Sequence, residues 1–193
     1  MKKGLLVILS APSGTGKSTI CRELIKNNKD WKFSISATTR IPRDGEIDGE
    51  AYQFISNKEF EHFAKFGDFL EWEIVHGNKY GTLWESVEEA LNKKKVVIFD
   101  VDVKGAMTIK EEYPDQTLLL FIEPPGDNIN EQKEALNERL LNRGHEQTTQ
   151  IKHRLKRFET EMEFKDKFDH SFMNENLKKT IENVEKLIKG NIK

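Results

Sequence analysis

Residues 5–19 read LLVILSAPSGTGKST, and this stretch decides the fold. A continuous apolar run such as 5–10 is typical of a strand in a parallel sheet whose two faces are both covered. The small residues that follow end in Lys17 and two hydroxyls, and 17–28 has the apolar spacing of a helix. A strand, a glycine-rich turn and a helix in this order predict a loop that binds phosphate through its backbone N–H groups.

The loop fits the pattern G-x-x-x-x-G-K-[ST] at every position but the first, where Ala11 replaces glycine. Gly14 and Gly16 let the backbone turn its N–H groups toward an anion. Lys17 is expected to bridge the β- and γ-phosphates, and Ser18 to hold Mg²⁺. A plain strand-to-helix turn with a chance Gly-Lys-Ser is the alternative, which the lysine in register disfavours. The pattern predicts a triphosphate binder and leaves open whether it is a GTPase, a motor or a kinase.

Composition limits the protein class. The 193 residues are 33% charged with a formal net charge of -2, so we expect one sizeable core and no nucleic-acid partner. A single cysteine, Cys21, excludes an internal disulfide and a cysteine metal cluster. No run approaches the roughly 20 apolar residues of a membrane span. We therefore predict a cytoplasmic protein without a membrane partner, and the sequence is compatible with a homo-oligomer.

Strands and helices alternate along most of the chain, which predicts an α/β fold with a mainly parallel sheet. Further strands are expected at 96–102, 117–125 and 170–173. The expected helices span about 84–94, 104–112, 131–142, 148–165 and 175–189.

Residues 34–83 break this alternation. They hold short β-like pieces (FSISATT, AYQFI, FLEWEIV), a turn-rich patch and one helix near 57–66, which predicts a small mixed α+β subdomain inserted in the core domain. The core domain would then comprise 1–33 and 84–193. The polar segment 142–150 joins two helices and is interpreted as the tip of a lid, which spans about 126–160.

The segment 36–54, SATTRIPRDGEIDGEAYQF, narrows the function. Arg40 and Arg43 lie near a turn, with Glu46 and Tyr52 close by. Arginine pairs bind phosphate in a bidentate manner, and a tyrosine hydroxyl adds a donor. Taken alone, the segment is explained equally well as a solvated surface loop.

At this point the chain resembles the guanylate kinases. The shared motifs extend from residue 7 to beyond 170 and read APSGTGKS, TTRIPRDGEIDGEAYQF, FLEW…GNKYGT, DVDVKGA and RLLNRG…RL. The resemblance implies a P-loop NTPase-type parallel sheet flanked by helices, an inserted subdomain that binds GMP and a helical lid. It also implies Mg²⁺-dependent transfer of the γ-phosphoryl group of ATP to GMP, giving ADP and GDP, with dGMP as a further expected acceptor.

The same resemblance assigns roles to matching positions. The GMP site is expected at Ser36, Arg40, Arg43, Glu46, Tyr52, Glu71, Tyr80, Thr82 and Asp102. Within this set Ser36, Glu71 and Thr82 would read guanine, Asp102 would lie near the base, and Glu46 would orient the arginines or reach the sugar side. The ATP site is expected at Ala11, Pro12, Ser13, Gly14, Thr15, Gly16, Lys17, Ser18, Thr19 and Asn174. Phosphoryl transfer is expected to involve Lys17, Arg43, Arg139, Arg143 and Arg154, with Mg²⁺ at Ser18 and Asp100.

Two departures from the family pattern, one structural alternative and three alternative functions accompany this interpretation. Ala11 replaces glycine, and 124–140 is longer than expected, which leaves the register of Arg139 open while Arg143-Gly144 fixes that of Arg143. Arg139 and Arg143 could also be solvated helix residues. A non-catalytic guanylate-kinase-like binding module, a kinase acting on a sugar phosphate and a GTPase switch remain alternative functions. The binding module is disfavoured by the intact loop, and the sugar-phosphate kinase by the presence of Glu71 and Thr82. The GTPase switch is disfavoured by the lack of an Asn-Lys-x-Asp motif.

Overall fold

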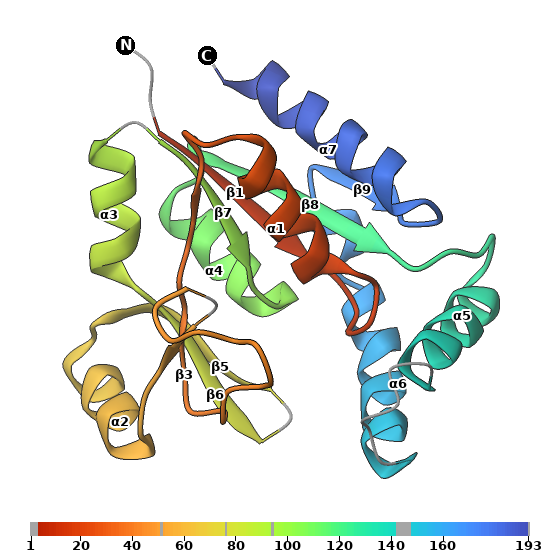
Figure 1. Ribbon diagram of the computed structural model, residues 1–193, viewed down its shortest axis with the longest axis horizontal. Helices are drawn as coiled ribbons and strands as arrows, with labels where there is room; N and C mark the ends of the chain where they lie inside the picture. Colours follow the sequence, from red (N-terminus) through yellow and green to blue (C-terminus); the bar gives the residue numbers. More distant parts are fainter. Residues whose placement is uncertain (1–3, 51, 76, 94, 142–147, 193) are drawn as a thin grey trace.

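The structure is a computed structural model in which two sheets and their helices are arranged side by side (Figure 1). The described residues are 4–50, 52–75, 77–93, 95–141 and 148–192, with side chains from Arg154 onward in the last range. Among these residues, no helix is both long and apolar enough to cross a membrane.

The larger sheet is parallel throughout, with the order β2-β7-β1-β8-β9. Its strands are β1 (Leu5–Ser10), β2 (Lys32–Phe33), β7 (Val96–Asp100), β8 (Thr117–Glu123) and β9 (His170–Met173). β1 lies in the centre, and its residues from Leu6 to Ser10 are all buried. The parallel α/β sheet predicted from the sequence is therefore confirmed.

Helices cover both faces of this sheet, as the unbroken apolar run of β1 requires. On one face α1 (Lys17–Asn27) and α7 (Leu177–Asn191) pack on Val7 and Leu9. On the other face α3 (Trp84–Asn92) and α4 (Val103–Glu112) pack on Leu6 and Ile8. Alternate residues of β1 therefore serve two separate cores.

The second sheet, with the order β4-β3-β6-β5, carries the inserted subdomain. Its elements are β3 (Ala37–Thr38), β4 (Gln53–Phe54), α2 (Asn57–Phe66), β5 (Phe69–Val75) and β6 (Asn78–Leu83). Phe60 of α2 packs on Phe69 and Ala37. α2 begins at a capping box formed by Ser56 and Glu59, which explains the predicted helix near 57–66.

The structure corrects one prediction in this region. The stretch FSISATT was expected to be a single piece of the insert, but Phe33 belongs to β2 and pairs with Ile98 of the core sheet. The backbone N–H of Ser34 also donates to Ile98 O at 2.9 Å, and the second sheet begins only at Ala37. β6 was not predicted as a strand, because its six residues contain a glycine and show no alternation.

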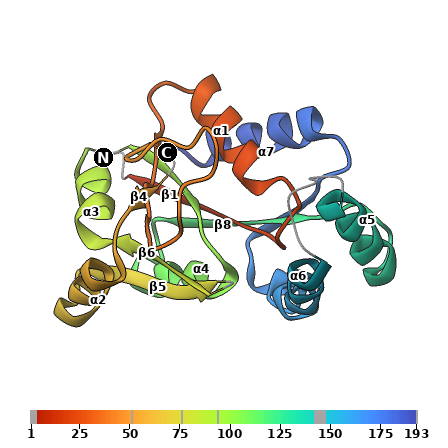
Figure 2. The same cartoon turned by 60° about the horizontal axis from the view of Figure 1, so that its bottom comes forward.

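A pair of helices lies on the other side of the core sheet from α2 and β5 (Figures 1 and 2). α5 (Ile129–Leu141) and α6 (Thr148–Met162) pack through Leu136, Leu140 and Phe158. A short 3₁₀ helix, η1 (Lys165–Lys167), then leads to β9. α5 begins two residues earlier than predicted, and most of the predicted lid tip, 142–147, lies outside the described residues.

Candidate active site

A cavity of about 750 Å³ lies between the glycine-rich loop, the end of β7, the second sheet and α6. Most of the predicted site residues meet on its wall. They are Ala11, Pro12, Ser13, Gly14, Thr15, Gly16, Lys17, Ser18, Thr19, Ser36, Arg43, Glu46, Tyr52, Glu71, Tyr80, Asp100, Asp102 and Arg154.

The loop has the backbone geometry that its glycines predict. Gly14 and Gly16 have φ angles of 102° and 98°, in the region that residues with a Cβ avoid. Gly16 is also the N-cap of α1, so the first turn of the helix starts directly behind it. The side chain of Ala11 is buried in the core beneath the loop. The methyl group that alanine adds at the first position of the loop pattern is therefore accommodated by the core.

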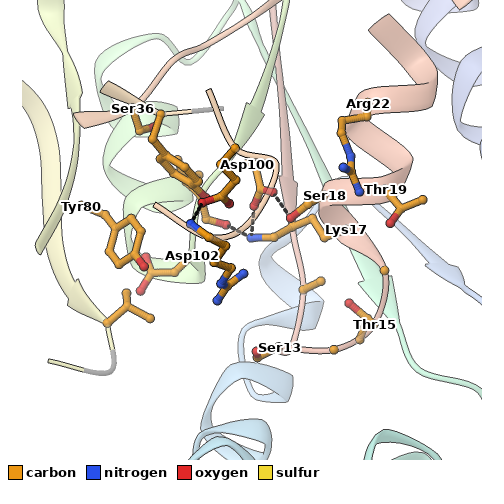
Figure 3. A pocket seen from close by; sticks show the side chains of 18 of the residues that line it. Ser13, Thr15, Lys17, Ser18, Thr19, Arg22, Ser36, Tyr80, Asp100 and Asp102 are labelled. Atoms are coloured by element: carbon orange, nitrogen blue, oxygen red, sulfur yellow. Dashed lines mark hydrogen bonds and ion pairs between the residues drawn. The ribbon is translucent and has the colours of Figure 1, made fainter. Parts of the chain in front are cut away.

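Asp100 joins the lysine and the serine of the loop. The Lys17 Nζ lies 2.7 Å from Asp100 Oδ1, and the Ser18 hydroxyl donates to Oδ2 at 2.6 Å (Figure 3). Lys17 also donates to the carbonyl oxygen of Val101 at 2.7 Å. Burial acts to lower the pKa of Lys17, but the charge and hydrogen bond of Asp100 outweigh it and raise this pKa. The lysine is therefore held as a cation at the cavity wall.

Ser18 and Asp100 also provide ligand atoms that suit Mg²⁺, since hard divalent cations prefer hydroxyl and carboxylate oxygens. Nowhere in the described part of the chain do three or more His, Cys, Asp or Glu side chains gather as a metal site. Two protein oxygens fit an ion that completes its shell with substrate phosphates and water.

Arg40 and Glu46 form an ion pair on the side of the second sheet. Arg40 Nη2 donates to both carboxylate oxygens of Glu46 at 2.9 Å, and the backbone N–H of Arg43 donates to Oε2 at 2.8 Å. Burial acts to raise the pKa of Glu46, but these N–H groups and the Arg40 charge lower it below its ordinary value. Arg40 also lies 5.4 Å from the ring centre of Tyr52. This arrangement turns Arg40 into a support for the loop, whereas the exposed Arg43 lines the cavity.

Glu71 lies at the base of the same wall. The buried Thr82 donates its hydroxyl to Glu71 Oε1 at 2.6 Å, from the neighbouring strand. Burial raises the pKa of Glu71 to about 7, partly offset by that hydrogen bond and reinforced by the charge of Asp102. Asp102 itself accepts from the Gly105 N–H at 2.9 Å and caps α4. The wall thus presents a carboxylate whose charge is sensitive to its surroundings.

Arg139 and Asn174 line a second, smaller cavity of about 300 Å³ beside Gly14, Gly16 and Thr19. Arg139 donates to the carbonyl oxygen of Asn174 at 2.8 Å, and Asn174 Nδ2 donates to Thr15 O at 2.7 Å. The structure therefore places Arg139 against the loop and Asn174, away from the cavity that Lys17 lines.

α6 contributes the remaining charged residues. Arg154 donates to the Ser13 hydroxyl at 2.6 Å, which ties the helix to the loop. Arg157, to which the sequence assigned no role in the site, lies 3.2 Å from Asp102 Oδ2 and 3.4 Å from Glu161 Oε1. The i,i+4 spacing could have indicated the pair with Glu161, but nothing local indicates the contact with Asp102. Arg143 lies outside the described residues.

Known proteins match this chain along almost its whole length. The sequence profile described as guanylate kinase matches residues 3–191. Guanylate kinase of Clostridium tetani is 42% identical over 97% of this chain and 86% of its own length. Guanylate kinase of Wolinella succinogenes is 44% identical over 92% of this chain and 80% of its own length.

Solved structures extend the comparison to the fold. The crystal structure of guanylate kinase from Anaplasma phagocytophilum matches with a TM-score of 0.81 and 26% identity, over 99% of this chain and 87% of that one. A gluconokinase from Sinorhizobium meliloti shares the fold at 13% identity, with a TM-score of 0.51, over 100% of this chain and 95% of that one. The family profile, the curated relatives and the close structural match agree, and the chain belongs to the guanylate kinase family.

Proposed function

We propose that this protein transfers the γ-phosphoryl group of ATP to GMP, giving ADP and GDP. The observation that carries the proposal is one cavity with two unlike walls. Lys17 and the glycine-rich loop form one wall, and Glu71 forms the other together with Arg43 and the tyrosines of the second sheet. This arrangement suits a reaction that brings two phosphorylated nucleotides together, and it agrees with the names of the relatives.

The inserted subdomain, residues 34–83, is proposed to bind GMP. Guanine presents its N1–H and its 2-amino group side by side, and one carboxylate can accept from both. Glu71 is such a carboxylate, fixed by Thr82 at its other side. Arg43 and the hydroxyls of Tyr52 and Tyr80, whose rings lie 5.8 Å apart, supply charge and donors for the phosphate.

The core domain, residues 1–33 and 84–193, is proposed to bind ATP along the glycine-rich loop. Backbone N–H groups at the start of α1 favour phosphate oxygens, and Lys17 adds a full positive charge. Asn174 Oδ1 is buried and has no hydrogen-bond partner among the residues that the structure describes. Such an acceptor suits the amino group of adenine, which would lie in the smaller cavity beside Arg139.

Mg²⁺ is proposed to bind at Ser18 and Asp100, where it would neutralise phosphate charge during transfer. The protein's own contribution is to align and hold the charged groups. The GMP phosphate is already a nucleophile, so the site requires no general base. Lys17, Arg43 and Arg154 place positive charge around the space between the two proposed nucleotides.

The helices α5 and α6 are proposed to act as the lid of the site, over about 126–160. Arg154 on α6 already contacts Ser13 of the loop. Hydrolysis of ATP is the side reaction that this enzyme must avoid, so an element that excludes water is required. The role of Arg143 and the expected cytoplasmic location, homo-oligomer and use of dGMP stay predictions.

One assay tests the proposal and its alternatives. Purified protein with ATP and Mg²⁺ is supplied with GMP, AMP, CMP, a sugar phosphate or no acceptor, and ADP release is measured. Of these acceptors, we expect only GMP to cause rapid release of ADP. Release without an acceptor would indicate an ATPase activity, and release with the sugar phosphate would indicate a different kinase. No release would indicate a binding module or a GTPase, which GDP release from added GTP would distinguish.

A further inference from the structure

Gly105 occupies a position where its own helix would favour alanine. It lies in the first turn of α4, with no positive φ angle that would require glycine. Glycine in a helix costs about 1 kcal/mol relative to alanine. The local backbone therefore gives no reason for this residue, and the reason has to come from what it packs against.

The contact partner is the carboxylate of Glu71. A Cβ added to Gly105 would lie 2.7 Å from Glu71 Oε2 and 3.1 Å from Glu71 Cδ. The next nearest atom, Oδ1 of Asp102, would lie at an ordinary 3.5 Å. The space that a side chain at Gly105 would occupy is therefore taken by the carboxylate of Glu71, the group that is proposed to bind guanine.

The carboxylate of Glu71 is held from two sides. Thr82 fixes Oε1 through a hydrogen bond of 2.6 Å, and the flat surface of α4 at Gly105 supports Oε2. Gly105 is itself fixed, because its N–H donates to Asp102 at 2.9 Å. A methyl group at this position would leave the backbone of α4 in place and displace the end of the Glu71 side chain.

We propose that Gly105 is a positioning residue for guanine specificity, because its lack of a side chain lets Glu71 lie where both carboxylate oxygens can serve the base. The inference rests on the proposed function of the site. The end of a side chain moves more easily than a backbone. A substitution at Gly105 therefore changes substrate recognition more than it changes the stability of the fold.

The test compares Gly105→Ala with Gly190→Ala. Gly190 lies in α7, and an added Cβ there has nothing within 4 Å, so it is a matched helical glycine without a contact. For Gly105→Ala we expect kcat/KM for GMP to fall about 10- to 100-fold, as a displacement of reacting groups by about 1 Å can cost. The KM for ATP and the thermal midpoint should stay close to the wild-type values. Gly190→Ala should leave kcat/KM for GMP and the KM for ATP unchanged, and it should raise the thermal midpoint slightly because alanine favours the helix.

A double-mutant cycle shows whether Gly105 acts through Glu71. In a Glu71→Ala background, Gly105→Ala should change kcat/KM for GMP by less than about twofold, because the carboxylate that it displaces is absent. An equal loss in both backgrounds overturns the proposal, as does a Gly105→Ala enzyme with wild-type kcat/KM for GMP. If Gly105→Ala fails to fold, folding of the double variant supports the contact and its failure to fold overturns the proposal.

The wild-type assay separates this inference from the proposed function. A wild type that releases no ADP with GMP overturns the proposed function, and the inference falls with it. A wild type that accepts GMP, with a Gly105→Ala variant that is unaffected, overturns the inference alone.

Discussion

Lys17 and Asp100 form an ion pair in which Nζ and Oδ1 are 2.7 Å apart. The two residues come from different elements, since Lys17 begins α1 and Asp100 ends β7. They meet because β7 pairs with β1 in a register that places Asp100 opposite Leu9, just before the loop. The pairing of two core strands therefore determines where the positive charge of the loop lies.

Lys17→Ala should reduce kcat by about 10²- to 10³-fold or more, because the lysine stabilises charge on the phosphates during transfer. Lys26→Ala is the matched control, as Lys26 lies exposed on the same helix. Steady-state ADP release and a circular dichroism spectrum check the result. A Lys17→Ala enzyme with near wild-type kcat would contradict the assignment of the loop.

Glu71→Gln should lower kcat/KM for GMP, with a loss of roughly 1–3 kcal/mol of transition-state stabilisation. An amide accepts from one guanine donor and turns an N–H toward the other. The value of kcat/KM for AMP should fall less, so kcat/KM for GMP divided by that for AMP should decrease. Glu61→Gln, on the exposed surface of α2, serves as control. An undiminished ratio in Glu71→Gln would exclude Glu71 from base recognition.

The preference for GMP should also depend on pH. Burial raises the pKa of Glu71 to about 7, so the free enzyme loses the accepting carboxylate as the pH falls below 7. We expect kcat/KM for GMP, divided by that for AMP, to rise between about pH 6 and pH 8. The ratio cancels titration of the substrate phosphate, which is common to both nucleotides. In Glu71→Gln the ratio should stay flat, and a flat wild-type profile would contradict the prediction.

Glu161→Gln should stabilise the fold at alkaline pH. Glu161 is buried, and burial raises its pKa from 4.5 to about 7, partly offset by the charges of Arg157 and Lys17. The folded protein therefore binds this proton more tightly than the unfolded chain, and the stability contributed by the neutral form is lost as the pH rises toward 7.

The corresponding free energy is about 3 kcal/mol at most. Urea unfolding should show Glu161→Gln to be more stable than the wild type at pH 8, with the difference shrinking toward pH 5. Glu163→Gln, at an exposed neighbouring position, should show no such dependence. Equal stability of Glu161→Gln and the wild type at pH 8 would show that Glu161 is not held neutral by its surroundings.

Arg139→Ala should raise the KM for ATP more than it lowers kcat. The guanidinium lies against Asn174 in the smaller cavity, away from the cavity lined by Lys17. The KM for GMP should change by less than about twofold, and initial rates with each substrate varied in turn measure both constants. A fall in kcat with an unchanged KM for ATP would instead indicate that Arg139 contacts the transferred phosphoryl group.

The phosphate loop could be predicted from the sequence because its signals are local. A buried strand, positive-φ glycines and a helix follow one another within 5–28, and the structure has them in this order. The second sheet was harder to predict. β2 and β3 have two residues each, too few for a periodic pattern, and their membership of different sheets depends on distant partners.

In the candidate site, too, local features could be predicted and contacts between distant segments could not. The resemblance supplied the residues of the cavity wall and the expectation that Glu46 orients the arginines, but it did not show that Arg40 does not line the cavity. It also did not show the contacts of Gly105 with Glu71 and of Arg157 with Asp102, which join residues 34 and 55 positions apart. Such contacts arise from how two sheets and α6 pack, and packing between distant segments leaves no pattern in the chain.

The connection between the two sheets has a mechanical consequence. Ser34 still bonds to Ile98 of the core sheet, while Ser36 O already accepts from the N–H of Gln53, so the chain changes sheets within Ile35 alone. It returns at Leu83, where β6 ends and α3 begins at the next residue. Two such short crossings leave few backbone torsions free, so we expect a movement of the second sheet to be a rotation about the line that joins them. Ser36 lies next to one of these crossings, so we expect it to move little in such a rotation.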